Sequence, residues 1–408
     1  MSGRGTTTAA SGTGRLPRFG LALIGVLLIA VNLRASFTAV GPVLGLMRRD
    51  LGLGGAAAGL LTSLPLLAFA AFSPVAPALA RRLGLDRALW LALLLIALGI
   101  VTRSAPWAAG VWAGTALLGI GIAFINVLLP SLVKRDFPHR VAQVTGVYSA
   151  VQSSVAAVAA GVVVPIADAS PWSWRLALGV WAGMALVAMA VLLPRVRRRK
   201  APESGTATGT GAGAVPELRR SPWTAALAWQ VTIFMGLQSV PFFIFVAWLP
   251  SILHDRGISA GTAGWYLFLF QIVSVLGNLG TATLAHRFAD QRLIGLAGGV
   301  LCFLTYAGLL VVPQLALLWT VTGGLGCGST IVLALSLFSL RTRNHGQAAA
   351  LSGMAQSVGY LLAAAGPIAF GWLHDLTGGW SFPLGLTAAV MAVMSVFAVL
   401  ASRNRFLA

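Results

Sequence analysis

One arginine, Arg34, lies near the middle of the first long apolar stretch of the chain, residues 19–47. A charge at the centre of a membrane helix costs about 2.5–3.5 kcal/mol on insertion scales, so it normally faces a cavity or a partner. All nine acidic residues fall in loops or at the ends of apolar stretches. An unpaired guanidinium suits an anion with planar oxygens. We therefore predict that Arg34 binds an anion; the alternative is that it caps backbone carbonyls or extends toward the membrane surface.

Two polar residues close to Arg34 extend this predicted substrate site. Asn32 lies roughly 200° around a helix from Arg34, so the two cannot point at one spot, and bonding to a neighbouring helix is the competing role for Asn32. Thr38 follows Arg34 by one helical turn on the same face. We include both in the predicted site, with Thr38 sharing the cavity of Arg34.

A second polar group comes from two later apolar stretches. Tyr148 and Gln152 lie one turn apart, as do Gln356 and Tyr360, and the two glutamines are separated by 204 residues. Glutamines that face each other across a pseudo-two-fold axis can hold a small polar ligand. The competing role is bonding between helices, worth about 0.6 kcal/mol each. We predict that these four residues bind substrate. The secondary candidates are four amide side chains, for which helix packing is the alternative to ligand contact: Asn126, Gln238, Gln271 and Asn278.

The elements that must position these residues are membrane helices. The chain is 58% hydrophobic and 9% charged, against about 25% charged in a soluble domain. A spanning helix needs about 20 predominantly apolar residues. The sequence predicts an all-α membrane protein with about twelve transmembrane helices, near residues 19–47, 54–80, 88–104, 106–133, 141–167, 173–194, 222–252, 260–285, 291–312, 314–340, 345–372 and 379–402.

The basic residues predict how the chain lies in the bilayer. With the N-terminus inside, 22 of the 28 lysines and arginines fall in cytoplasmic segments, five (Arg103 and Arg175 among them) fall outside, and Arg34 lies within a span. Because cytoplasmic loops favour Lys and Arg, we predict a plasma (inner) membrane protein with both termini in the cytoplasm. The net charge of +19 is spread in short clusters rather than gathered on one face, so no nucleic-acid partner is expected.

The chain divides into two halves of similar pattern. Residues 195–221 form one long polar loop, basic at both ends and rich in Gly, Thr and Ala between, which is typical of a flexible linker. A shift of 205 residues aligns Gly52 with Gly257 and Arg82 with Arg287. We predict two pseudo-symmetric six-helix bundles with a site between them. The predicted parts are a disordered cytoplasmic tail 1–18, bundles 19–194 and 222–402, the cytoplasmic linker 195–221 and a cytoplasmic tail 403–408.

Two loops, LARRLGLDR (79–87) and LAHRFADQR (284–292), resemble the Gly-x-Leu-Ala-Asp-Arg loop of the major facilitator superfamily. The aspartate of that loop falls at Arg81 and His286 in this chain, so a gating salt bridge built on it is not expected here. The resemblance implies alternating access between two bundles. It also implies gating loops that carry Arg81, Arg82, Arg87, Arg287 and Arg292.

A narrower resemblance is to the cyanate/2-nitroimidazole transporter family within that superfamily. The stretches that carry it are NLRASFTAVGPVL (32–44), GLLTSLPLLAF (59–69), NVLLPSLVKRDFP (126–138), TGVYS (145–149) and GWLHDLTGGW (371–380). The resemblance spans nearly the whole chain. It implies a secondary active or facilitative transporter of a small anionic or polar nitrogenous solute, cyanate-like or nitroimidazole-like.

Residues for other functions are not found in the sequence. The two cysteines lie inside apolar stretches and the five histidines lie in loops or at the ends of stretches, so we expect no metal site and no cofactor. No Walker loop or nucleophile–base pair indicates an enzyme. Because the apolar stretches hold no carboxylate or histidine to relay a proton, the expected mechanisms are uniport, exchange for a counter-anion, or symport with a proton. Two alternatives stay open: drug or antibiotic efflux by the same fold, and a non-transporting membrane sensor.

Overall fold

The computed structural model describes residues 16–137, 140–197, 222–285, 287–288, 290–343 and 345–407. Within these ranges the chain forms helices and no strand, and twelve helical segments are long and apolar enough to cross a membrane. The helices of the first half are α1 (Leu16–Val31), α2 (Ala35–Thr38), α3 (Val40–Leu51), α4 (Gly55–Phe72), α5 (Ala76–Leu83), α6 (Leu85–Ser104), α7 (Ala108–Asp136), α8 (Val141–Asp168), α9 (Ser173–Gly179) and α10 (Ala182–Arg197).

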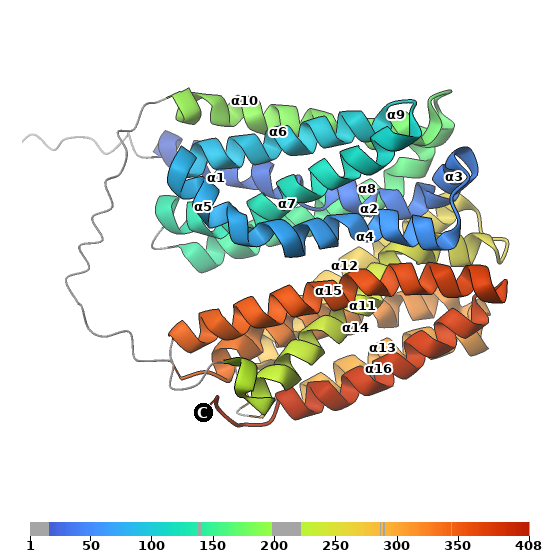
Figure 1. Cartoon of the computed structure of the whole chain (residues 1–408). Helices are drawn as coiled ribbons and strands as arrows, with labels where there is room; N and C mark the ends of the chain where they lie inside the picture. The colour runs from blue at the N-terminus through green and yellow to red at the C-terminus, as the bar shows by residue number, and fades with distance from the viewer. Residues whose placement is uncertain are drawn as a thin grey trace, which may run out of the picture.

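The second half repeats the six-span pattern, with each span formed by one unbroken helix. These helices are α11 (Ala226–His254), α12 (Ala260–Ala285), α13 (Arg292–Val311), α14 (Ala316–Leu340), α15 (His345–Thr377) and α16 (Ser381–Ala401). Short 3₁₀ turns at Ser73–Val75, Pro222–Thr224 and Pro313–Leu315 precede helices in both halves. The halves form two layers with their helices roughly aligned (Figure 1). Most of the predicted linker, residues 198–221, lies outside the described residues.

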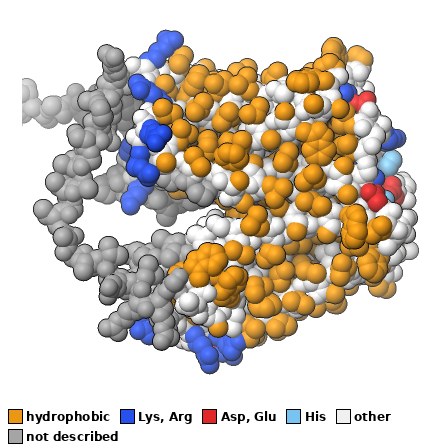
Figure 2. Space-filling model, viewed as in Figure 1, with side chains coloured by type: hydrophobic (Ala, Val, Ile, Leu, Met, Phe, Trp, Pro, Cys, Tyr) orange, Lys and Arg blue, Asp and Glu red, His pale blue; other side chains and the backbone are white. Residues whose placement is uncertain are grey.

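The outer surface of the visible flank is apolar between two charged edges (Figure 2). Large exposed hydrophobic side chains include Leu21, Val101, Leu279 and Val311. Such a surface suits hydrocarbon about 30 Å thick rather than water. The fold is therefore the predicted all-α, twelve-span membrane fold, whereas the cytoplasmic placement of the termini stays a prediction.

A repeated tryptophan–aspartate bond shows the relation between the halves. In the first half the indole of Trp174 donates to the carboxylate of Asp50 at 3.2 Å, and in the second half Trp380 donates to Asp255 at 2.8 Å. The aspartates are 205 residues apart, which is the shift that aligns the two halves in sequence. In each half the bond joins the end of the first span to the start of the sixth.

The first span departs from the prediction of one continuous helix. Helix α1 ends at Val31, and α2 and α3 follow after a break at residues 32–34. The backbone N–H groups of Asn32 and Leu33 bond three residues back, to Ile29 and Ala30, and the side chain of Asn32 donates to the carbonyl of Leu28 at 2.7 Å. Such tight turns interrupt an α-helix. In a membrane, a break of this kind occurs where backbone is buried in protein or lines a water-filled cavity.

Contacts between the halves gather at the end of the molecule away from the linker, here called the distal end. There, carbonyls of the other half lie against glycines so closely that they leave no room for a Cβ atom: Val246 lies against Gly41, and Gly371 lies against Gly55. Further along the same helix pair, the carbonyl of Pro367 lies against Gly59. Toward the linker the two layers of ribbons diverge (Figure 1). The structure is therefore the conformation in which the distal face is closed.

Candidate functional site

Arg34 lies where the first span is broken and faces the second half of the molecule. It occupies the N-cap position of α2 and is half-buried. Its guanidinium lies over the ring of Phe242 in α11, 5.1 Å from the ring centre. Among the described residues, the structure gives this guanidinium no hydrogen bond and no ion pair. A positive charge with unused N–H groups thus stands at the interface between the halves.

Phe242, beside this charge, belongs to a group of aromatic rings that comes from both halves. The ring of Phe243 meets those of Phe242 and Phe37 edge-on, with centroids 5.2 and 5.6 Å away. Tyr360 packs against Phe69 of the first half at 4.6 Å and is close enough to Arg34 for an electrostatic interaction. Aromatic rings can stack on, or meet edge to face, a further flat ring. The arrangement is suited to a small planar solute that brings a negative charge to Arg34.

The two predicted neighbours of Arg34 use their polar groups on the protein itself. Asn32 is 2% exposed and bonds back to its own helix. Thr38 is fully buried, and its hydroxyl lies 3.1 Å from the carbonyl of Arg34 and 3.0 Å from that of Ala156 in α8. Because a hydroxyl has one hydrogen, its donor is used within the protein. The structure therefore places Thr38 between the first and fifth spans rather than in the space beside the Arg34 side chain.

The glutamine pair is divided between two interfaces. Gln152 lies on α8, which packs against α12, whereas Gln356 lies on α15, which packs against α4. Both are half-buried, and Gln356 donates to the hydroxyl of Ser352 at 2.8 Å. Tyr148 packs against the core of the first half, while Tyr360 lies in the aromatic group beside Arg34. Of these four residues, Tyr360 has an electrostatic interaction with Arg34.

The four secondary candidates differ in what they bond. Asn126 is exposed and donates to the carbonyl of Ile122, whereas Gln238 is buried and bonds Met235 and Ser239. Gln271 is 3% exposed, and its amide nitrogen has no partner; the amide oxygen of Asn278 is likewise unpaired. An unpaired buried amide is costly. Gln271 is therefore better placed than Asn126 or Gln238 to donate a bond to a ligand or a water, and Asn278 is better placed to accept one.

The predicted gating arginines lie at the linker end of the helices. All five are exposed: Arg81, Arg82, Arg87, Arg287 and Arg292. The ordered charge network at this end instead uses Asp86 of α6, whose carboxylate accepts hydrogen bonds from Nη1 and Nη2 of Arg135 at 2.8 Å. Asp136 extends the network to Arg195 of α10 at 2.7 Å. These bonds tie three spans of the first half together, and their gating role stays a prediction.

Charged and aromatic residues close the distal end. Arg48 of α3 lies 3.7 Å from the carboxylate of Asp375 in α15 and 5.6 Å from the ring centre of Trp248. The backbone N–H of Ala56 donates to the same carboxylate at 3.2 Å. His374, next along α15, has its ring 3.9 Å from that of Trp380. This cluster covers the glycine contacts between the halves.

Replacing Asp375 by Asn tests how much the ion pair contributes to this closure. The pair is partly exposed, and such pairs are worth about 0–1 kcal/mol, so we expect transport rates to change by less than about fivefold. The amide oxygen still accepts from Ala56. Initial rates of uptake in proteoliposomes measure the effect. A loss above about tenfold would show that the ion pair, rather than backbone packing, holds the face closed.

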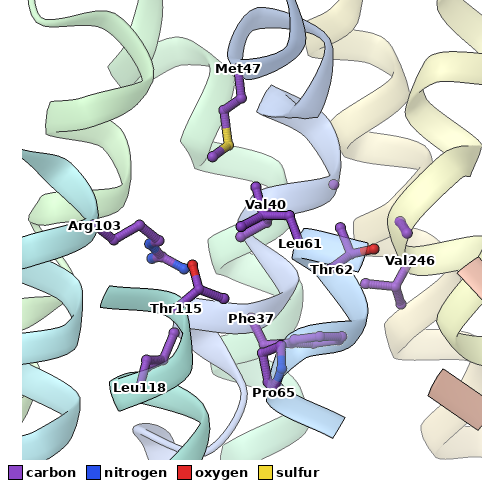
Figure 3. A pocket seen from close by; sticks show the side chains of 12 residues that line it. Phe37, Val40, Met47, Leu61, Thr62, Pro65, Arg103, Thr115, Leu118 and Val246 are labelled. Carbon is purple, nitrogen blue, oxygen red and sulfur yellow. The ribbon is translucent and has the colours of Figure 1, made fainter. Parts of the chain in front are cut away.

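Two side chains of the site region were not identified from the sequence. Phe242 is one of 19 phenylalanines, and no spacing distinguishes it from those in the core. The sequence places Arg103 among the charges outside the membrane, which stays a prediction, but it does not show that the side chain is 1% exposed, inside the first half. It lines a small pocket with Thr115 and Leu118 of α7 and with Val246 of α11 (Figure 3). Its place at the end of an apolar stretch made it resemble an ordinary helix-end charge.

The chain matches known proteins along nearly its whole length. A family model described as Major Facilitator Superfamily matches residues 26–364. The chain is 43% identical over 388 residues to an uncharacterized transporter, YycB, of Bacillus subtilis (strain 168), covering 94% of each chain. It is 41% identical over 399 residues to the 2-nitroimidazole transporter of Escherichia coli (strain K12), covering 98% of each. It is 28% identical to the cyanate transport protein CynX of the same organism, covering 92% of this chain and 97% of that one.

A solved structure shares the fold at low sequence identity. It is a bacterial homologue of the human lysosomal transporter Spinster, solved in an inward-facing and occupied conformation. The TM-score is 0.78 with 14% identical residues, and the match covers 95% of this chain and 97% of the other. At that level of sequence identity, the match shows that the fold is shared and nothing more.

Proposed function

Because the chain belongs to the major facilitator superfamily, we propose that it transports a small anionic or polar nitrogenous solute, cyanate-like or nitroimidazole-like, across the inner membrane. The solute binds between the two halves and is released by alternating access. The proposal places the linker end in the cytoplasm, so the closed distal face is the periplasmic one. The proposal thus assigns the diverging linker ends of the two halves to the cytoplasmic side (Figure 1).

The observation that carries this proposal is the unpaired guanidinium of Arg34 at the break in the first span. It faces Phe242 of the other half, so a solute bound to it touches both halves. A charge within a membrane protein is stabilised by a counter-charge, and an anionic solute supplies one. The substrates in the names of two relatives, cyanate and 2-nitroimidazole, support the same chemical class.

The charge distribution favours an anion over a bulky cation. The described carboxylates lie at helix ends or in loops, as Asp50, Asp86 and Asp375 do, and Arg34 gives the central site a positive sign. A drug cation bound there would meet repulsion without a compensating acid. The solute is proposed to move alone, in exchange for a counter-anion, or together with a proton.

Uptake by purified protein in proteoliposomes tests this function. The panel is cyanate, nitrite, nitrate, 2-nitroimidazole and benzoate, with tetraphenylphosphonium as a bulky apolar cation. We expect saturable uptake of at least one of the five planar solutes above protein-free liposomes and none of the cation. Saturable uptake of the cation alone would contradict the proposal and favour drug efflux.

Substituting Phe242 by Leu tests the role of the aromatic wall. The change removes the ring face next to Arg34, and ring contacts of this kind are worth about 0.5–1.5 kcal/mol. We expect KM for a ring-containing solute to rise about 2- to 12-fold. For cyanate, which has no ring, the rise is expected to be smaller. Phe382→Leu, at an exposed phenylalanine of α16, is the control. Equal effects on ring-containing and ringless solutes would contradict a stacking role.

A further inference from the structure

Arg103 is a buried cation that the proposed transport site does not use. It lies one residue before the end of α6 and is 1% exposed. Its Nη1 donates to the carbonyl of Ser36, in the short helix α2, at 3.0 Å. Its Nε and Nη2 are buried and have no hydrogen-bond partner. Among the described residues, no carboxylate forms an ion pair with it.

The unpaired nitrogens belong to a side chain that lines a small cavity between the halves. The walls come from four spans of the first half and from Val246 and Ala247 of α11 (Figure 3). Its volume is about 10 Å³, near the smallest space that holds one water-sized particle. In this conformation the cavity is therefore too small for benzoate or 2-nitroimidazole.

The chemistry of the walls favours an acceptor with a negative charge. The hydroxyl of Thr115 donates to the carbonyl of Val111 at 2.6 Å, and that of Thr62 donates to Gly59 at 2.9 Å. Both hydroxyl hydrogens are thus used, and the other lining side chains are apolar. The free donors are the N–H groups of Arg103. A neutral water would accept hydrogen bonds from them but would leave the buried charge uncompensated. An anion accepts the hydrogen bonds and also compensates the charge.

We propose that Arg103 forms a second anion site, separate from Arg34, that binds one halide-sized ion such as chloride. The ion is enclosed on one side by α11 of the other half. Its binding therefore stabilises the conformation with a closed distal face. When α11 moves away from α3 during transport, the site opens and the ion is released.

Thermal unfolding of the purified protein tests this site. The midpoint Tm is measured in sodium chloride and in sodium gluconate at equal ionic strength, for wild type, Arg103→Gln and Arg34→Gln. A ligand at about ten times its Kd stabilises the folded state, and we expect chloride to raise Tm by about 2–4 °C in wild type and in Arg34→Gln. We expect no rise in Arg103→Gln, where the amide keeps a donor for Ser36 but the charge is gone.

A second variant covers the case in which Arg103→Gln does not fold. Thr115→Leu fills the cavity and leaves Arg103 in place, so it too should lose the chloride-dependent rise. No rise in wild type would overturn the proposal and leave water as the occupant. A rise that persists in Arg103→Gln or Thr115→Leu, or one lost in Arg34→Gln alone, would also overturn it. The chloride site is tested by the chloride-dependent rise in Tm, and the proposed solute site at Arg34 is tested by uptake. Failure of one proposal is therefore distinguished from failure of the other.

Discussion

Replacing Arg34 by Gln is expected to reduce uptake of an anionic solute at least about thirtyfold, since loss of one partner of a buried charged pair costs about 2–5 kcal/mol. Glutamine removes the charge but keeps a polar group of moderate length. In the structure no other described cation takes part in the aromatic group around Phe242. The neighbouring amides cannot replace the charge.

The lysine variant separates charge from shape at this position. Arg34→Lys keeps the positive charge but loses the planar fork that donates two parallel bonds. We expect its uptake rate to lie between those of wild type and Arg34→Gln. The matched control is Arg49→Gln, an exposed arginine at the end of the same span, which should stay within about twofold of wild type. If both Arg34 variants transport at the wild-type rate, Arg34 is structural and the site search moves to Gln152 and Gln356.

Adding one methyl group at Gly41 is expected to open the distal face. A Cβ atom there meets the backbone carbonyl of Val246 in the other half, so the two helices must separate. Overpacking of this kind costs about 1–3 kcal/mol, which shifts the balance between conformations roughly 5- to 150-fold. We expect Gly41→Ala to lose uptake by about tenfold or more.

Gly45 supplies a matched control one turn along the same helix. A Cβ atom at Gly45 meets no atom within 4 Å, so Gly45→Ala should leave uptake unchanged. A cysteine placed at Thr62, now 5% exposed, reports on opening through its rate of alkylation. The two native cysteines are buried and are replaced by alanine in this background. Equal alkylation rates in Gly41→Ala and Gly45→Ala would contradict the closed distal interface.

The sequence predicted the spans well because bilayer thickness fixes their length and composition. The stretch 260–285 coincides with α12, and 291–312 differs from α13 by one residue at each end. The break in the first span was not predicted, because its cause is local bonding at Asn32 and Leu33 rather than an interruption of hydrophobicity. Apolar composition determines where a helix crosses the membrane but does not determine whether that helix is continuous or broken.

The candidate site was predictable from the sequence only where placing a residue in the membrane costs free energy. Arg34 stood out because a charge in an apolar stretch needs compensation. The rings around it did not, since phenylalanine is favourable everywhere in a membrane helix and its direction depends on helix packing. Thr38 lies on the predicted helix face, but its hydroxyl bonds the fifth span. Arg103 was missed because its burial results from how α6 packs against α7, which no local pattern reveals.

Equilibrium binding to purified protein tests the central claim, that Arg34 holds an anion between the halves, most directly. The solute that wild type transports is titrated into wild type and Arg34→Gln by calorimetry, in chloride-free buffer. We expect saturable binding by wild type and a Kd at least about thirtyfold higher in Arg34→Gln. The same Kd in both proteins would contradict the claim, because the solute would then bind without using the charge at position 34.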